Sequence, residues 1–281
     1  MHLVRPQSST IIFGFDSAWT DSPKAPGAVC AVAFDDAGKA EFHEPRLVSF
    51  AEARNFIDSL RKDFAVSLVA LDQPTVVPNT MGSRPVDKVA ASLVSFIGGG
   101  VQPANRGKIG MFCDNAPIWP FLSCLGATED PVRARTACAG HFLIEVFPAL
   151  ALPALLDDFA QRLRAPKYNP QNRKKFRLED WQAVTRVIAL TAEQFGLSSF
   201  VDWARKMHDA THPRKSDQDK VDAALCALIG LLWRAGPNSR SVMLGDVDSG
   251  YMITPISNKT FPRLEQAANR RGVPMRQIYS S

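Results

Sequence analysis

Four acidic side chains lie where an apolar segment begins, ends or is interrupted, and this pattern suggests metal-dependent chemistry. Asp16 and Asp72 each follow a continuous apolar stretch, Glu145 lies inside Phe142–Phe147, and Asp222 opens the most apolar helical segment. A carboxylate on an apolar face is costly unless it is paired or coordinates a cation. The four positions together therefore predict an acidic cluster built from distant parts of the chain.

A fifth acid, Asp219, precedes Asp222 by three residues, so a helix would direct both side chains the same way. Ordinary structural explanations exist for each acid. Asp72 precedes Gln73-Pro74 and could belong to a turn, Glu145 could satisfy a buried arginine or a backbone amide, and Asp219 could serve only the start of the helix. Their joint occurrence favours a site.

Hard divalent cations take oxygen ligands, and two ions about 3.5–4 Å apart need several carboxylates that meet at one point. We predict that Asp16, Asp72, Asp219 and Asp222 bind Mg²⁺ or Mn²⁺ and that, together with Glu145, they are catalytic. Such a site can polarise a phosphodiester, activate water and stabilise the leaving oxygen. The predicted partner is therefore a nucleic acid, either DNA or RNA.

Basic residues that could bind phosphates lie in two places. The stretch 166–177 contains Lys167, Arg173 and Lys174 with interleaved aromatic side chains, and Arg84 lies earlier in the chain. Cations next to aromatic rings are typical of nucleic-acid contacts. We predict that these four residues bind substrate, provided that the stretch folds over the acids; the alternative is a solvated start of a helix.

The elements that would position the acids follow from the hydrophobic patterns. Strands are expected at Thr10–Phe15, Gly27–Phe34 and Ala40–Phe50, followed by a helix at Ala51–Lys62 and a strand at Val66–Leu71. Two short hairpin connections followed by a helical crossover predict a mixed α/β sheet whose first three strands are antiparallel.

The remainder is expected to add mainly helices. One strand is predicted at Phe142–Phe147, and a hairpin is predicted from Ser241–Leu244 and Gly250–Thr254. Six helices are predicted, at Pro85–Ile97, Ala149–Leu163, Leu178–Phe195, Phe200–Met207, Asp217–Trp233 and Pro262–Arg271. We expect a single domain over residues 1–281, with an insertion at about 74–140 and a helical, basic insertion at about 157–215.

The composition fits an ordinary globular protein. The chain has 281 residues, of which 46% are hydrophobic and 22% are charged, and a net charge of +5 that permits a nucleic-acid partner. Five cysteines without a CxxC pair disfavour a secreted disulfide framework and favour the cytoplasm. The longest apolar run, Ala223–Trp233, is too short to cross a bilayer, so no membrane association is expected.

At these positions the sequence resembles the RNase H-like superfamily and, more closely, the domain-of-unknown-function family 429 (DUF429), whose members are described as predicted RNase H-like nucleases. The motifs that carry the resemblance are Phe13-Gly14-Phe15-Asp16, Leu71-Asp72-Gln73-Pro74, Arg84 with Asp87, Glu145-Val146-Phe147-Pro148, Asp219-Lys220-Val221-Asp222-Ala223-Ala224 and Gly250-Tyr251-Met252-Ile253-Thr254-Pro255. The resemblance implies an RNase H-like mixed five-stranded sheet, flanked by helices and carrying helical insertions, with acids at the strand ends.

The leading hypothesis is a divalent-metal-dependent nuclease. One alternative is a non-catalytic protein on the same scaffold that binds nucleic acid or another ligand and has a regulatory role. Another is a small-molecule kinase of the actin-like fold. That fold normally needs two such domains and glycine-rich phosphate loops, which are hard to fit into 281 residues.

Overall fold

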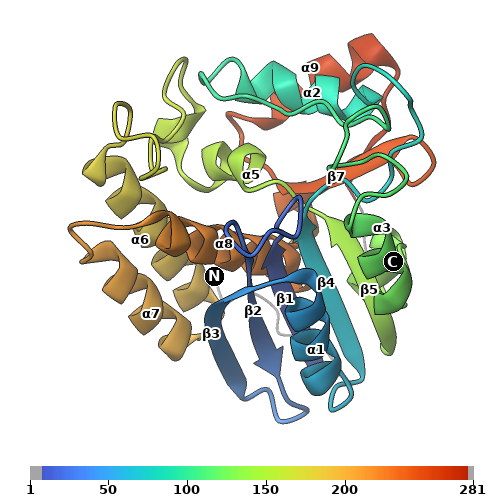
Figure 1. Cartoon of the computed structure of the whole chain (residues 1–281). Coiled ribbons are helices and arrows are strands. Elements are labelled where there is room, and N and C mark those ends of the chain that lie inside the picture. Colours follow the sequence, from blue (N-terminus) through green and yellow to red (C-terminus); the bar gives the residue numbers. More distant parts are fainter. Residues whose placement is uncertain (1–7, 278–281) are drawn as a thin grey trace.

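A mixed five-stranded sheet forms the centre of the computed structural model, which describes residues 8–277 (Figure 1). Its strand order is β3-β2-β1-β4-β5. The five strands are β1 (Thr10–Asp16), β2 (Gly27–Phe34), β3 (Ala40–Val48), β4 (Val66–Asp72) and β5 (Gly140–Glu145).

The strand directions agree with the prediction. β1 pairs with β2, and β2 with β3, in antiparallel fashion, whereas β1–β4 and β4–β5 are parallel. A loop over residues 17–26 joins β1 to β2 and a short turn joins β2 to β3, while each parallel step needs a crossover. As a result, the carboxyl ends of β1, β4 and β5 lie at one edge of the sheet.

Helices make up most of the rest of the chain. They are α1 (Phe50–Arg61), α2 (Pro85–Val94), α3 (Ile118–Leu125), α4 (Pro131–Thr136), α5 (Pro148–Leu155), α6 (Leu178–Gln194), α7 (Ser198–His208), α8 (Lys215–Ala235) and α9 (Phe261–Arg271). Among the described residues, no helix is both long enough and apolar enough to pass through a bilayer.

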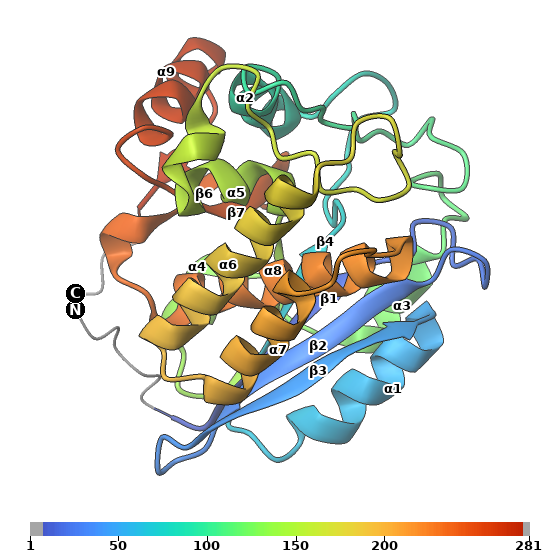
Figure 2. The ribbon, with the colours of Figure 1, turned by 90° about the vertical axis from the view of Figure 1, so that its left-hand side faces the viewer.

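Both faces of the sheet are covered by helices (Figures 1 and 2). Alternate side chains of β1 point to opposite faces of the sheet, as the period of two in a strand requires. Ile12 belongs to the core beneath α6, α7 and α8, whereas Ile11 and Phe13 belong to the core beneath α1 and α3. The sheet thus forms the middle of three layers.

A second, smaller sheet lies beyond the acidic edge of the first. Its order is β7-β6-β8, with bounds β6 (Ser241–Asp246), β7 (Gly250–Pro255) and β8 (Met275–Arg276). Together with α2, α5 and α9 it encloses a core of its own, and a bridge between Val146 and Ile253 connects it to the end of β5 (Figure 1). The predicted hairpin is confirmed as β6–β7.

Several boundaries differ from those expected. The third strand ends at Val48, because Ser49 caps α1 through a reciprocal pair of hydrogen bonds with Glu52. The helix expected at 149–163 ends at Leu155: Pro153 removes one helical hydrogen bond, and the backbone is extended at Leu156. Within the segment 74–140, α3 and α4 were not expected.

Candidate active site

Asp16 and Asp72 are direct neighbours at the ends of two parallel strands. The register of β1 against β4 pairs these residues with each other, and on the next strand Leu71 pairs with Glu145. Both aspartates keep partial exposure, while the strand residues before them are buried. The sheet therefore brings together two carboxylates that are 56 positions apart in the sequence at the rim of the core.

Helix α8 adds two further acids because it packs unusually close to β1. A Cβ atom on Gly14 would lie 2.1 Å from the carbonyl oxygen of Ala223, so only glycine permits this approach. Asp219 and Asp222, in the first two turns of α8, are both buried. The helix thereby directs its acids toward the carboxyl ends of β1 and β4.

The acids of α8 have polar partners, whereas Asp16 and Asp72 have none among the described residues. Tyr168 Oη donates to Asp222 Oδ1 at 2.7 Å, and Gln218 Nε2 donates to Asp222 Oδ2 at 2.9 Å. Lys215 Nζ donates to Asp219. Within residues 8–277, no hydrogen bond to the carboxylates of Asp16 or Asp72 is found, and this leaves both carboxylates available as ligands.

Charges of neighbouring aspartates contribute to raising the pKa values of Asp16, Asp72 and Asp222. Burial, followed by the charges of Asp222, Asp72 and Asp219, raises the pKa of Asp16 well above its usual value. Burial and the charge of Asp222 likewise raise the pKa of Asp72. Burial raises the pKa of Asp222 to about 6, against the opposing effects of Tyr168 and Lys215. Negative charge has accumulated here, and Lys215 compensates only part of it.

The donor set suits a hard cation, although the side chains are not arranged around one. In the part of the chain that the structure describes, no group of three or more His, Cys, Asp or Glu side chains is placed to hold a metal ion. Lys215 supplies the positive charge instead. However, Gln218 Oε1 is buried without a hydrogen-bond partner beside Asp222. A free carbonyl oxygen and several carboxylates are the ligands that Mg²⁺ and Mn²⁺ prefer.

Glu145 and Arg84, predicted as catalytic and substrate-binding residues, form a buried ion pair beside the cluster. Arg84 Nη1 and Nη2 donate to the two oxygens of Glu145 at 2.8 and 2.6 Å, and Arg84 also bonds Asp87. Arg84 is 0% exposed, so it cannot reach a substrate in this structure. Glu145 corresponds to the structural alternative considered above, an acid that satisfies a buried arginine.

This ion pair supports the turn that follows Asp72. The backbone N–H of Thr75 donates to Glu145 Oε2 at 3.0 Å. In the same turn, the side chain of Gln73 accepts a hydrogen bond from Ser17, the residue after Asp16. The ends of β1 and β4 are thus fastened to each other by residues just outside the sheet. Ser17 has no distinctive spacing in the sequence, and Gln73 was visible there only as part of a turn and a motif.

The basic stretch lies partly over the acids, and its uncharged polar residues, not its cations, are the ones that reach them. Tyr168 bonds Asp222, and Gln171 lines the same pocket as Asp16. Lys167 Nζ instead donates to the carbonyl oxygen of Gly98 at 3.1 Å. Two further predicted contacts, Arg173 and Lys174, are exposed. The loop therefore reaches the acids through Tyr168 and Gln171, and none of its three predicted cations is among the residues that line the pocket.

A pocket of about 390 Å³ opens beside the acids. Four segments line it: the end of β1 with the loop to β2, Leu47 near the end of β3, the start of α8, and the loop before α6. Its polar and aromatic residues include Asp16, Trp19, Lys24, Lys215 and Asp219. Trp19, Lys24 and Lys215 were missed, and only Lys215, four residues before Asp219, could have been noticed from a helical spacing.

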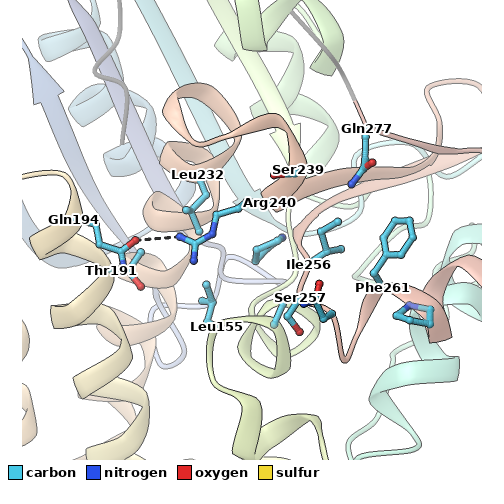
Figure 3. A pocket seen from close by; sticks show the side chains of 14 residues that line it. Leu155, Thr191, Gln194, Leu232, Ser239, Arg240, Ile256, Ser257, Phe261 and Gln277 are labelled. Carbon is cyan, nitrogen blue, oxygen red and sulfur yellow. Dashed lines mark hydrogen bonds between the residues drawn. The ribbon is translucent and has the colours of Figure 1, made fainter. Parts of the chain in front are cut away.

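A larger pocket, of about 670 Å³, lies away from the acids (Figure 3). It is lined by ends of α5, α6, α8 and α9 and by the residues after β7, and Arg240 Nη1 donates to Gln194 Oε1 at 3.1 Å within it. None of the predicted site residues lines this pocket, so its size does not make it the candidate site.

Fold and site together define a mixed α/β protein with an acidic cluster at the ends of two parallel strands, closed by the start of one long helix. The chain belongs to a family described as protein of unknown function (DUF429), whose model matches residues 14–244. The matched region contains all five predicted acids. No curated protein and no solved structure matches the chain significantly. The RNase H-like relationship therefore stays a prediction.

Proposed function

We propose that this protein hydrolyses phosphodiester bonds of nucleic acid with the help of Mg²⁺ or Mn²⁺. The observation that carries the proposal is the pairing of Asp16 with Asp72 at adjacent parallel strand ends, completed by Asp219 and Asp222 from α8. Carboxylates that raise one another's pKa are typical of sites that bind a cation or exchange protons. The net charge of +5 and the exposed lysines support an anionic substrate.

In this proposal Asp16, Asp72 and Asp222 hold the cation, and Gln218 Oε1 and Asp219 complete its surroundings. When bound, the cation supplies an activated water and stabilises charge on the phosphate. Tyr168 keeps the carboxylate of Asp222 in one orientation through its hydrogen bond. Lys215, released from Asp219, can contact a phosphate oxygen. Arg84 and Glu145 act indirectly, because their ion pair holds the turn after Asp72 in place.

Two observations favour a second candidate, a non-catalytic protein that binds nucleic acid or another ligand. The contact of Lys215 with Asp219 already neutralises part of the cluster, and the described side chains form no ready metal site. In that case the acids would bind one ion or none, and the pocket would hold a ligand without cleaving it.

A cleavage assay distinguishes the two candidates. Fluorescently labelled DNA and RNA, single-stranded and duplex, are incubated with the protein in Mg²⁺, Mn²⁺ or EDTA. We expect cleavage only with a divalent cation. Loss of a metal ligand should cost more than the roughly 10–100-fold typical of outer residues, so Asp16→Asn and Asp72→Asn should be nearly inactive. Asp63→Asn, an exposed acid before β4, is the matched control.

The outcomes are exclusive. Cleavage at the wild-type rate by both Asp16→Asn and Asp72→Asn would refute the assignment of the site. Absence of cleavage with either cation, combined with calorimetry that detects no Mn²⁺ binding, would leave the second candidate.

A further inference from the structure

The pocket beside the acids combines features that serve different parts of one ligand. Asp16 and Asp219 contribute carboxylates, Lys24 and Lys215 contribute ammonium groups, and Trp19 contributes an aromatic ring. A pocket that bound only a metal ion would need no indole. The combination suits a ligand that has both an anionic group and a flat ring.

Trp19 is held in place and is partly exposed. Its ring contacts Phe112 edge-on, with centroids 5.4 Å apart and planes at 64°, and Phe112 is fully buried. Trp19 also packs against the same buried cluster, which includes Val77 and Ala104, and its exposed part contributes to the lining of the pocket. Nucleobases stack on such rings whatever their sequence, because every base has a π-face.

Lys24 supplies a positive charge that its surroundings do not neutralise. Its side chain is exposed, and no ion pair of Lys24 is found among residues 8–277. It lies five residues after Trp19 in the same loop, between β1 and β2. A phosphate next to a stacked base could therefore meet Lys24, and the adjoining phosphate would face Asp16.

We propose that this pocket takes one unpaired nucleotide of a single-stranded nucleic acid, with the base on Trp19 and a phosphate at Lys24; this inference rests on the proposed function. Small-ligand pockets measure roughly 300–1,000 Å³. At about 390 Å³, this pocket lies within that range and suits a ligand of the size of one nucleotide. A base that remains stacked and paired in a duplex cannot enter it.

Binding can be tested without catalysis. The Asp16→Asn variant of the full chain is titrated in EDTA against a fluorescein-labelled single-stranded 12-mer, the corresponding blunt duplex and a mononucleotide, with anisotropy or Trp fluorescence as the readout. To this background we add Trp19→Leu, Trp19→Phe or Lys24→Ala. Lys39→Ala is the matched control, because Lys39 is an exposed lysine in the turn at the opposite end of β2.

We expect Trp19→Leu to raise the Kd for the single strand by about tenfold or more and Trp19→Phe to restore most of the affinity. Lys24→Ala should weaken binding and reduce its salt dependence, whereas Lys39→Ala should change neither. The duplex should bind at least about tenfold more weakly than the single strand. The mononucleotide should bind weakly and with the same dependence on Trp19, because it offers a single base and phosphate.

Two results would overturn the inference: equal Kd values for Trp19→Leu and its parent, or a duplex bound as tightly as the single strand. Either could occur while the wild-type protein still cleaves nucleic acid, in which case the proposed function survives. Conversely, Trp19-dependent binding without cleavage in Mn²⁺ would support the pocket and contradict the proposed function.

Discussion

Asp16 and Asp72 are an unfavourable pair in the folded protein. Both are partly buried, they face each other across β1 and β4, and no described residue donates a hydrogen bond to either carboxylate. Folding must therefore bury both carboxylates close to the charge of Asp222, with Lys215 in partial compensation, and their pKa values are raised first by burial and then by these like charges. Residues that oppose stability in this way are typical of functional sites.

The first prediction concerns stability and pH. Asp16→Asn should increase the free energy of unfolding by about 1–2 kcal/mol at pH 8, because it removes a buried charge and its repulsion by Asp222 without loss of a hydrogen bond. Because its pKa is raised in the folded state, Asp16 keeps its proton there at pH values at which the unfolded chain has lost it. The loss of stability caused by Asp16 is therefore absent at low pH and grows as the pH rises from the unfolded toward the folded pKa. Urea unfolding at pH 8 and pH 5 measures this.

The gain should accordingly shrink at pH 5. Asp63→Asn, which alters an exposed acid, should change little at either pH. A loss of stability in Asp16→Asn at pH 8 would show that the carboxylate is favourably paired in solution.

The second prediction separates Arg84 from the surface arginines. Arg84→Met should destabilise the fold by about 3–5 kcal/mol, because it leaves the carboxylates of Glu145 and Asp87 buried without their cation. Arg173→Met, at an exposed position, should change stability by less than about 0.5 kcal/mol. Thermal or urea unfolding of both variants is sufficient. Equal stabilities would contradict the buried ion pair.

Much of the architecture was predictable from the elements. Continuous apolar runs located β1, β2 and β4 to within a residue, because strands that are buried on both faces leave no polar interruptions. The helices α3 and α4 were missed because they are short and lie in a segment rich in Pro and Gly, where no period of 3.6 accumulates. The second sheet could not be foreseen, since a hairpin pattern does not say which sheet it joins.

The third prediction concerns the contact between α8 and β1. Gly14→Ala would place a Cβ 2.1 Å from the carbonyl oxygen of Ala223 and 2.3 Å from the amide nitrogen of Ala227, so the helix must move outward. We expect a loss of about 1–3 kcal/mol or more and, since α8 carries Asp219 and Asp222, a loss of metal-dependent activity. Gly100→Ala, which meets nothing within 4 Å, is the control. Unchanged stability would mean that α8 packs less tightly.

At the scale of the whole molecule, the candidate site is a consequence of topology. The sequence identified four aspartates, but their meeting depends on the parallel register of β1 and β4 and on the path of α8 across the sheet. The burial of Arg84 could not be predicted for the same reason. Its motif is visible in the sequence, but its burial depends on segments far away along the chain, including Glu145. Pocket residues such as Trp19 came from a loop with no periodic signal at all.

The final prediction links the cluster to stability through its ligand. A cation that binds only the folded state raises the melting temperature in a saturable way, and 100-fold excess over Kd adds about 2.7 kcal/mol. Mn²⁺ should therefore raise the Tm of the wild-type protein at pH 8 and much less at pH 5, where Asp222, with its pKa of about 6, is mostly protonated. Asp16→Asn should lose most of the shift, and Asp63→Asn should keep it. Differential scanning fluorimetry with a Mn²⁺ titration measures all three proteins, and an equal shift in Asp16→Asn would place the ion elsewhere.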